Sequence, residues 1–383
     1  MSTSFPIGRI LGIPIRVHLS WFVVLGLVTS GEAWQLRELA TAPAALVAGL
    51  VSALLLFSSV LLHELGHCVA ARAFGIHVRR IQLFLFGGVA EILGEPRAVL
   101  DEVVIAAAGP AVSISLAVAL VPAAWLAPAG LGRTVALFAL FANVMLFAFN
   151  MVPAFPTDGG RILRALLWGA LGDYRRATRW AAGLGIAFAS LMILGGIAMA
   201  WSGGLPAGAT TEELLSARFG GAWMSMVGLF LARSARAGVE QARVSAALRD
   251  ACVGDAMLPI TLQIDSGATL LEIFTAAGGP SAAEMLLGFS VAGGDGACLG
   301  FVEPANLFAI PRESWGSVRA GEVMTPIAHL PRLAASDPLD LLVREIVERG
   351  AAGALIFDGE RLVGYAGRSD VARFLMESRG FES

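Results

Sequence analysis

The pentad His63-Glu64-Leu65-Gly66-His67 stands at the end of a long apolar run, where ionisable side chains are not expected. Residues 43–62 before it carry no charge, and residues 68–71 after it are apolar or small. Ionisable groups inside a membrane helix are energetically unfavourable, and where they occur they usually serve a function. Residues four apart share one face of a helix, so both histidines can bind one Zn²⁺, with Glu64 beside them as general base. The pentad predicts a zinc hydrolase site within a membrane helix.

The composition of the whole chain is that of a membrane protein. Of its 383 residues, 56% are hydrophobic and only 15% are charged. Soluble domains contain about 45–50% apolar and about 25% charged residues. The formal net charge of −3 argues against a nucleic-acid partner. The three cysteines are scattered and predict no disulfide framework.

Six apolar stretches are expected as membrane-spanning helices, which need about 20 residues each. They cover residues 16–30, 41–71, 98–127, 134–151, 180–201 and 219–232. The connections on one side of the membrane contain Arg37, Arg133 and Arg218, whereas the termini and the other connections contain many more arginines. Because arginine is enriched on the cytoplasmic side, both termini are expected in the cytoplasm. The predicted fold class is a polytopic α-helical protein of the cell membrane with about six transmembrane helices.

The fourth expected span ends in the segment Asn150-Met151-Val152-Pro153-Ala154-Phe155-Pro156-Thr157-Asp158-Gly159-Gly160. This span runs in the same direction as the span that carries the pentad, so Asp158 arrives at a similar depth on the same side. A catalytic zinc site has three protein ligands and an open position for water. Asp158 is therefore predicted as the third metal ligand. The alternative is that this aspartate only caps the helix that begins near Gly160.

Asn150 lies at the base of the same segment, eight residues before Asp158. Its side-chain amide could donate a hydrogen bond to the oxyanion of the reaction or hold the substrate backbone. Ordinary capping of a helix end is the alternative for this residue. Pro153 and Pro156 cannot continue a helix, so the chain is expected to open there and to present Asp158 inward.

The motifs H-E-x-x-H and N-x-x-P-x-x-P-x-D-G-G together resemble the site-2 protease family of intramembrane zinc metalloproteases. The resemblance covers residues 1 to about 235 and implies that His63, His67 and Asp158 are zinc ligands and that Glu64 is the base. Members of this family cut membrane-spanning helices of substrates, often anti-sigma factors or other regulators. The resemblance thus implies a transmembrane protein as substrate and the lipid bilayer as the site of reaction.

Two further stretches bear on this resemblance. Residues 86–91, Phe-Gly-Gly-Val-Ala-Glu, are similar to the hairpin that follows the second span of the family. Residues 74–96 contain Gly87, Gly88 and Gly94 between short apolar runs and predict a membrane-associated β-hairpin, whose edge strand could pair with an unwound substrate. One departure is Ser113, which follows Gly109-Pro110 where many members have an asparagine.

Beyond residue 232 the composition changes, and charged residues become frequent. Residues 233–249 are expected as a linker helix. Two similar units follow, because Val253-Gly254-Asp255-Ala256-Met257 recurs as Ala320-Gly321-Glu322-Val323-Met324, and Gly300-Phe301-Val302 recurs as Gly364-Tyr365-Ala366. The two units resemble a pair of cystathionine-β-synthase (CBS) domains, an α/β module that often binds adenine nucleotides.

In the CBS family a serine or threonine and an aspartate near the last helix contact the phosphate and the ribose. The resemblance therefore implies that Ser369 and Asp370 bind a nucleotide in the second unit. Ala305 and Asn306 occupy the corresponding places in the first unit, so at most one nucleotide site is expected. The alternative is a module that forms a homodimer and binds no ligand.

These observations predict a zinc metalloprotease domain at 1–235, a linker helix at 236–250, and CBS units at 251–315 and 316–383. The predicted function is intramembrane zinc-dependent endopeptidase activity under the control of a cytoplasmic CBS pair. Two other functions stay open. A CBS-gated transporter or channel could also place histidine and carboxylate side chains in the membrane, and an inactive relative could bind membrane helices without cutting them.

Overall fold

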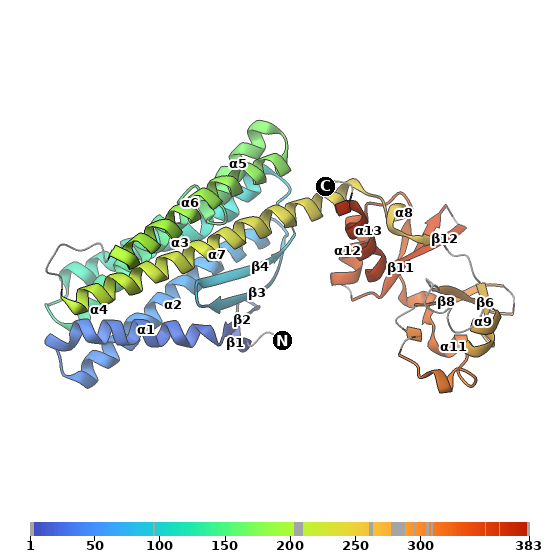
Figure 1. Ribbon diagram of the computed structural model, residues 1–383, viewed down its shortest axis with the longest axis horizontal. Coiled ribbons are helices and arrows are strands. Elements are labelled where there is room, and N and C mark those ends of the chain that lie inside the picture. The colour runs from blue at the N-terminus through green and yellow to red at the C-terminus, as the bar shows by residue number, and fades with distance from the viewer. Residues whose placement is uncertain are drawn as a thin grey trace. The chain divides into compact units, whose positions relative to one another are not determined.

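The computed structural model describes residues 4–94, 96–202, 210–259, 263–276, 288–294, 296–303, 306–307, 309–348, 350–359 and 361–380. The chain divides into two compact units, Met1–Ala242 and Arg243–Ser383 (Figure 1). Each unit has buried apolar clusters of its own.

The first unit contains a four-stranded sheet with the order β1-β2-β3-β4. Its strands are β1 (Ser4–Ile10), β2 (Ile13–His18), β3 (His77–Phe84) and β4 (Gly87–Leu93). β3 and β4 are antiparallel and form the hairpin predicted for residues 74–96. The sheet packs on the end of α2 (Ala42–Ala73) that carries the pentad, through Val60, Leu65 and Cys68. β4 is an edge strand of this sheet, so one side of its backbone is not paired with another strand.

The first expected span, 16–30, begins too early. Ile13, Ile15 and Val17 are buried and alternate with less buried neighbours, which is the period of a strand. This segment pairs with β1 and β3, and α1 (Ser20–Gln35) begins only after it.

Seven α-helices are described in this unit besides the sheet, together with the short 3-10 helix Leu36–Glu38. After α1 and α2 come α3 (Val99–Leu126), α4 (Leu131–Asn150), α5 (Asp158–Leu171), α6 (Tyr174–Ser202) and α7 (Thr211–Asp250). Among the described residues, α2, α3, α4, α6 and α7 are long and apolar enough to cross a membrane, and α1 is shorter with 16 residues. Trp125 and Leu126 are 71% and 83% exposed, which fits a surface covered by lipid. The unit is a polytopic α-helical membrane domain, as the sequence predicts.

α7 differs from the expected arrangement of a short span at 219–232 and a separate linker helix. The structure has one continuous helix of 40 residues. The change in composition at Arg233 does not interrupt it, because alanine and arginine are both strong helix formers. Polarity therefore marks where the helix leaves the apolar environment, not where it ends.

A glycine on α2 lets the pentad helix approach α3 closely. A Cβ atom at Gly66 would lie 2.9 Å from the carbonyl oxygen of Ala108. Small residues at such helix contacts allow backbones in a membrane to pack closely. Gly66, inside the pentad, thereby brings α3 into contact with the two histidines.

The second unit contains two four-stranded sheets of the same design, β6-β7-β8-β9 and β10-β11-β12-β5. In each sheet one parallel pair is followed by two antiparallel pairs. The short strand β5 of the first repeat joins the sheet of the second, and β9 of the second joins the sheet of the first. This exchange and the two repeats agree with the α/β CBS pair that the sequence resembles.

The elements of the second unit are short. They are α8 (Val253–Ala256), β5 (Leu258–Pro259), β6 (Gln263–Asp265), α9 (Leu270–Ala276), β7 (Phe289–Ala292), β8 (Cys298–Val302), α11 (Ala320–Val323), β9 (Thr325–Pro326), β10 (Arg332–Ala334), α12 (Leu339–Glu348), β11 (Gly353–Asp358), β12 (Arg361–Gly367) and α13 (Arg368–Gly380). Phe301 and Tyr365, at equivalent places in the two repeats, stack with ring centroids 4.0 Å apart.

Candidate metal centre and active site

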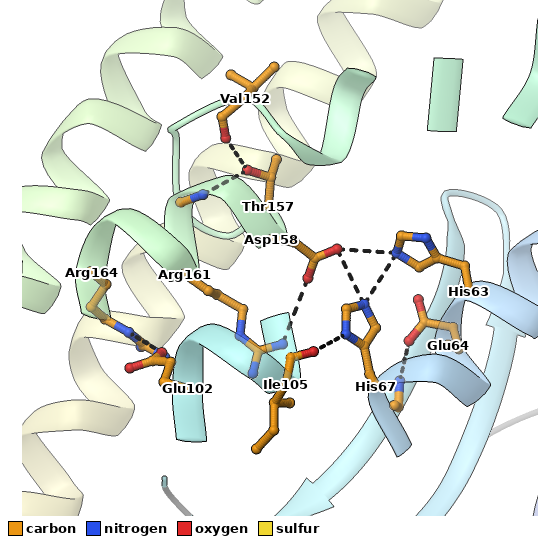
Figure 2. A network of polar contacts seen from close by, with 12 residues as sticks. His63, Glu64, His67, Glu102, Ile105, Val152, Thr157, Asp158, Arg161 and Arg164 are labelled. Atoms are coloured by element: carbon orange, nitrogen blue, oxygen red, sulfur yellow. Dashed lines mark hydrogen bonds and ion pairs between the residues drawn. The ribbon is translucent and has the colours of Figure 1, made fainter. Parts of the chain in front are cut away.

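Three buried side chains from two separate segments converge in the first unit (Figure 2). Nε2 of His63 lies 3.1 Å from Oδ2 of Asp158, and Nε2 of His67 lies 3.2 Å from the same oxygen. The two Nε2 atoms are 3.2 Å apart. His63, His67 and Asp158 are only 2%, 4% and 6% exposed. The structure thus brings together the three residues that the sequence predicts as metal ligands.

Helix α3 orients both imidazole rings through their second nitrogen atoms. Nδ1 of His67 lies 2.7 Å from the backbone oxygen of Ile105, and Nδ1 of His63 lies 2.9 Å from Oγ of Ser113. A carbonyl oxygen can only accept, so Nδ1 of His67 carries the proton and Nε2 presents a lone pair to the cluster. This tautomer is the one a metal ligand needs. Ser113 therefore makes the side-chain contact that the sequence left open where many site-2 proteases have asparagine.

The donor atoms fit a zinc ion. Two histidine nitrogens and one carboxylate oxygen are a usual protein ligand set for catalytic zinc. Bonds of about 2.0–2.1 Å at tetrahedral angles separate donor atoms by about 3.3 Å, and the three distances here are 3.1, 3.2 and 3.2 Å. A Cβ atom at Gly109 on α3 would overlap Nε2 of His67 and lie 2.7 Å from Nε2 of His63. The absence of a side chain at Gly109 keeps this space free.

Thr157 caps helix α5 and thereby leaves the Asp158 carboxylate available to the histidines. The Thr157 side chain caps α5, because its Oγ1 accepts a hydrogen bond from the Gly160 backbone nitrogen and donates one to the Val152 oxygen. The cap is therefore Thr157 and not Asp158, and the aspartate is free to face the histidines. A Cβ atom at Gly159 would lie 2.6 Å from the Val152 oxygen, so the turn before α5 closes tightly. Sequence reasoning missed Thr157, although threonine before a helix is a known capping signal.

Glu64 lies beside the histidines and is held by the edge strand. The Ala90 backbone nitrogen donates a hydrogen bond of 3.1 Å to Oε2 of Glu64. A Cβ atom at Gly88 would lie only 2.6 Å from Cγ of Glu64, so β4 rests directly on this side chain. The hairpin and the predicted base are thus in contact, a relation that spacing along the chain did not indicate.

Two arginines of α5 lie next to the cluster, and sequence reasoning gave them no role in the site (Figure 2). Nη1 of Arg161 lies 3.7 Å from Oδ1 of Asp158, the oxygen that does not face the histidines. Arg164 forms two hydrogen bonds to Oε1 of Glu102, a fully buried carboxylate on α3. The spacing of three residues from Asp158 to Arg161 was the available signal, because it places both on one side of a helix.

Asn150 is not part of the cluster of three. Its side-chain nitrogen donates a hydrogen bond of 2.9 Å to the Leu146 oxygen within α4, and the residue is half-buried. Asn143 of the same helix is fully buried and donates to Oγ of Ser59 at 2.9 Å. Asn143 therefore joins α4 to the pentad helix, and sequence reasoning missed it.

The candidate nucleotide residues of the second unit differ from each other in exposure. Ser369 is exposed, whereas Asp370 is buried and accepts a hydrogen bond of 2.9 Å from the Gly367 nitrogen at the start of α13. Burial raises the pKa of the Asp370 carboxyl, although the Gly367 hydrogen bond and Arg373 oppose this shift.

The corresponding positions of the first CBS unit are only partly described. Asn306 donates a hydrogen bond of 3.3 Å to the Val323 oxygen, and Ala305 lies outside the described residues. Nearby, the Tyr365 hydroxyl donates to Oε1 of Glu303. Asp370 and Asn306, which occupy corresponding positions in the two units, thus each form a hydrogen bond with a backbone group.

Comparisons with known proteins identify the family of this chain. Residues 51–128 and 124–194 match the family model "Peptidase family M50". The chain is 32% identical over 389 residues to Rip3, a candidate zinc metalloprotease of Mycobacterium tuberculosis strain H37Rv. This alignment covers 98% of this chain and 93% of Rip3. The solved structure of the site-2 protease of Methanocaldococcus jannaschii is 30% identical in sequence, with a TM-score of 0.43. The match covers 62% of this chain and 95% of the chain in that structure. A CBS domain of a bacterial CNNM/CorC family Mg²⁺ transporter covers 35% of this chain, with 15% identity and a TM-score of 0.28.

The protein is thus a zinc-dependent metalloprotease of the membrane. It belongs to peptidase family M50, the family of the site-2 proteases, and the resemblance seen in the sequence is confirmed. Intramembrane proteolysis is the general function of this family.

Proposed function

We propose that this protein hydrolyses peptide bonds within or near the transmembrane segments of membrane-bound regulators. In this proposal His63, His67 and Asp158 hold the zinc ion and Glu64 is the general base. The supporting observation is the convergence of three ligand atoms from α2 and α5, all within 4.8 Å of one another in a buried place. A transporter or channel would not require the donor atoms of His63, His67 and Asp158 to converge on a single point.

The residues have separate tasks in the reaction. Bound zinc supplies Lewis acidity for a water molecule and for the scissile carbonyl. Glu64 takes a proton from the attacking water and returns it to the leaving amine. The Ala90 N–H orients the Glu64 carboxylate at a fixed place beside the histidines. Asn150 donates to the oxyanion or to the substrate backbone, and for this its amide exchanges its present bond to the Leu146 oxygen.

The open edge of β4 is proposed to bind the substrate as an added strand. A substrate helix hides its carbonyl groups in its own hydrogen bonds, so it must unwind before hydrolysis. The Ala90 N–H donates to Glu64, and by alternation along the strand the Ile92 N–H is expected on the same side of β4. A peptide paired with this edge would run past Glu64 with its backbone extended.

The proposal for catalysis is tested with Glu64→Gln, measured together with zinc content. Purified Glu64→Gln protein is expected to hold about as much zinc as wild type and to cleave no membrane substrate. The substrates themselves can be found as membrane proteins whose fragments disappear from cells that carry only Glu64→Gln. A chain that contains no zinc, or a Glu64→Gln variant that still cleaves, would contradict the proposal. Transport activity without any cleavage by wild type would favour the transporter.

Strand addition is tested with Ile92→Pro against Ile92→Val. Proline removes the outward N–H but is tolerated on the open side of an edge strand. Cleavage of a transmembrane substrate is expected to fall at least about tenfold in Ile92→Pro, since main-chain hydrogen bonds supply affinity in this mode. Bound zinc should not change in either variant. Gly88 is a poor position for this test because any side chain there would meet Glu64.

The second unit is proposed as a regulatory CBS pair that binds an adenine nucleotide at Ser369 and Asp370 or, alternatively, forms a homodimer without a ligand. The buried Asp370 and exposed Ser369 at the start of α13 support a site that opens on the first turn of this helix. Calorimetry of the full chain with ATP, ADP and AMP tests this, with Ser369→Ala as control variant. A binding heat in wild type that is lost in Ser369→Ala would support the nucleotide site. The absence of a binding heat with all three nucleotides would contradict it and favour the homodimer without a ligand.

Both termini are proposed to be cytoplasmic on the basis of the arginine distribution. Cys252 is exposed and Cys68 is buried, so a membrane-impermeant thiol reagent should label Cys252. Labelling is expected in inverted membrane vesicles and not in right-side-out vesicles. The reverse pattern would contradict the proposed orientation.

A further inference from the structure

A cavity of about 210 Å³ lies beside β4 in the first unit. Ala90 and Ile92 line it from the strand, Ile105 from α3, and Arg161 and Arg164 from α5. Small-molecule sites usually have volumes of about 300–1,000 Å³. This cavity is smaller, and its size suits one side chain better than a free metabolite.

The cavity is next to the proposed reaction centre. The backbone oxygen of Ile105 accepts a hydrogen bond from His67, and Arg161 faces the outer oxygen of Asp158 (Figure 2). Ala90 donates to Glu64 from the same strand. A peptide on the edge of β4 that passes Glu64 would therefore place a side chain close to its scissile bond in this cavity.

The two arginines of the lining differ in what already binds them. Arg164 forms two hydrogen bonds to Glu102, and its guanidinium lies 4.9 Å from the ring of Phe155 and 5.0 Å from that of Tyr174. Its charge is paired and its planar faces are covered. It serves as a fixed wall of the cavity.

Arg161 has no such partner. Its only ion pair among the described residues is the 3.7 Å contact with Asp158, and no hydrogen bond to its guanidinium occurs within the described part of the chain. The Asp158 carboxylate is also shared with two histidines. The described residues that line the cavity include no aspartate or glutamate. Arg161 thus lines a small cavity with a guanidinium that has no acceptor within hydrogen-bond distance among the described residues.

We propose that this cavity is a subsite for an acidic side chain of the substrate and that Arg161 determines this specificity. An aspartate or glutamate close to the scissile bond would accept paired hydrogen bonds from the guanidinium, a geometry that arginine favours. A partly buried site strengthens this attraction relative to water. The inference rests on the proposed function and adds the substrate class that the site selects.

The test uses the full-length enzyme in detergent and a set of quenched fluorescent peptides. The peptides share one sequence, and aspartate or asparagine is placed at each position in turn on both sides of the cleaved bond. Wild type is expected to cleave the aspartate form at least about tenfold more efficiently than the asparagine form at one position, which is the low end for hydrogen bonds to charged groups. The measured quantity is this ratio of kcat/KM values.

Variants then assign the preference to Arg161. Arg161→Gln is expected to bring the ratio close to one, and Arg161→Glu to favour a lysine peptide at the same position. Arg79→Gln, an exposed arginine on β3, is the matched control and should keep the wild-type ratio. Zinc content measured on each variant separates an effect on Asp158 from an effect on the cavity.

The outcomes for the subsite and for the proposed function can be told apart. An unchanged ratio in Arg161→Gln, or no preference for aspartate at any position, would overturn the subsite while Glu64-dependent cleavage stands. Cleavage that does not depend on Glu64 would overturn the proposed function, and the subsite with it.

Discussion

Asp158 in the first unit and Asp370 in the second have nearly the same local setting. Each lies in the first turn of a helix, α5 or α13, and is 6% or 4% exposed. Each has an arginine three residues later, at 3.7 Å for Arg161 and 3.6 Å for Arg373. Their carboxylates nevertheless do different things.

The difference comes from the residue that caps the helix. At α5, Thr157 binds the free backbone N–H, so the Asp158 carboxylate is available to His63 and His67. At α13 no such side chain precedes the helix, and Asp370 itself accepts the hydrogen bond from the Gly367 nitrogen. Capping by Thr157 thus leaves the Asp158 carboxylate available as a candidate metal ligand, whereas the Asp370 carboxylate is used in a local backbone hydrogen bond.

The largest expected contrast follows from replacing each aspartate with alanine. Asp158→Ala should lose bound zinc and lower proteolysis by more than about 10³-fold, because a catalytic zinc site then lacks one of three protein ligands. Asp370→Ala should retain zinc and proteolysis and lower the unfolding free energy by about 1 kcal/mol, as for the loss of a helix cap. Zinc content, cleavage of a membrane substrate and thermal unfolding should be measured for both variants. Equal zinc loss in the two variants would break the comparison.

Gly109→Ala sharpens the comparison at the metal side. The added methyl group would overlap Nε2 of His67, so zinc affinity should fall at least about 100-fold, at the upper range seen for disturbed surroundings of metal ligands. Gly183→Ala is the matched control, because its Cβ would meet no atom within 4 Å. Normal zinc content in Gly109→Ala would show that the metal lies elsewhere.

Thr157→Ala tests the role of the cap in freeing Asp158. Loss of the cap should lower the unfolding free energy by about 1 kcal/mol, and Asp158 should then share its carboxylate with the helix N–H groups. Zinc affinity is expected to fall several-fold as a result. Thr157→Ser retains the hydroxyl and should restore both quantities. A loss of stability with unchanged zinc affinity would mean that the cap and the ligand are independent.

The smallest effect concerns the charge of Asp370. Burial raises the pKa of this carboxyl in the folded chain, so its protonated form is favoured there. Its contribution to stability is complete below the ordinary aspartate pKa and is lost as the pH rises through the raised value. Asp370→Asn should remove this dependence and raise the unfolding temperature slightly at pH 7. The same unfolding curves in wild type and Asp370→Asn between pH 4 and pH 7 would contradict the assignment.

Much of the fold and the site could be predicted, because the signals are local. Long apolar runs with few charges define the expected spans 41–71, 98–127, 134–151 and 180–201, and histidines four apart on a helix share one face. The direction of the fourth span brings Asp158 to the level of the pentad. The roles of His63, Glu64, His67 and Asp158 in catalysis stay predictions, although the structure brings together the three side chains that are predicted to bind the metal.

Other features depend on contacts between distant segments, which spacing does not reveal. Residues 13–18 form a strand because β1 and β3 flank them, although their composition also suits a membrane helix. The contact between Ala90 and Glu64 joins residues 26 apart in sequence. Arg161 and Ser113 acquire their surroundings only when α5 and α3 pack beside α2.

The convergence of His63 and Asp158 also has a mechanical consequence. These residues are 95 apart in the chain, so one ion bound between them would cross-link α2 to the start of α5. Metal binding that requires the native arrangement adds directly to its stability by thermodynamic linkage. A chelator should therefore do more than stop the chemistry. It should loosen α5 and expose the neighbouring turn to added proteases, so that metal starvation shortens the lifetime of the enzyme itself.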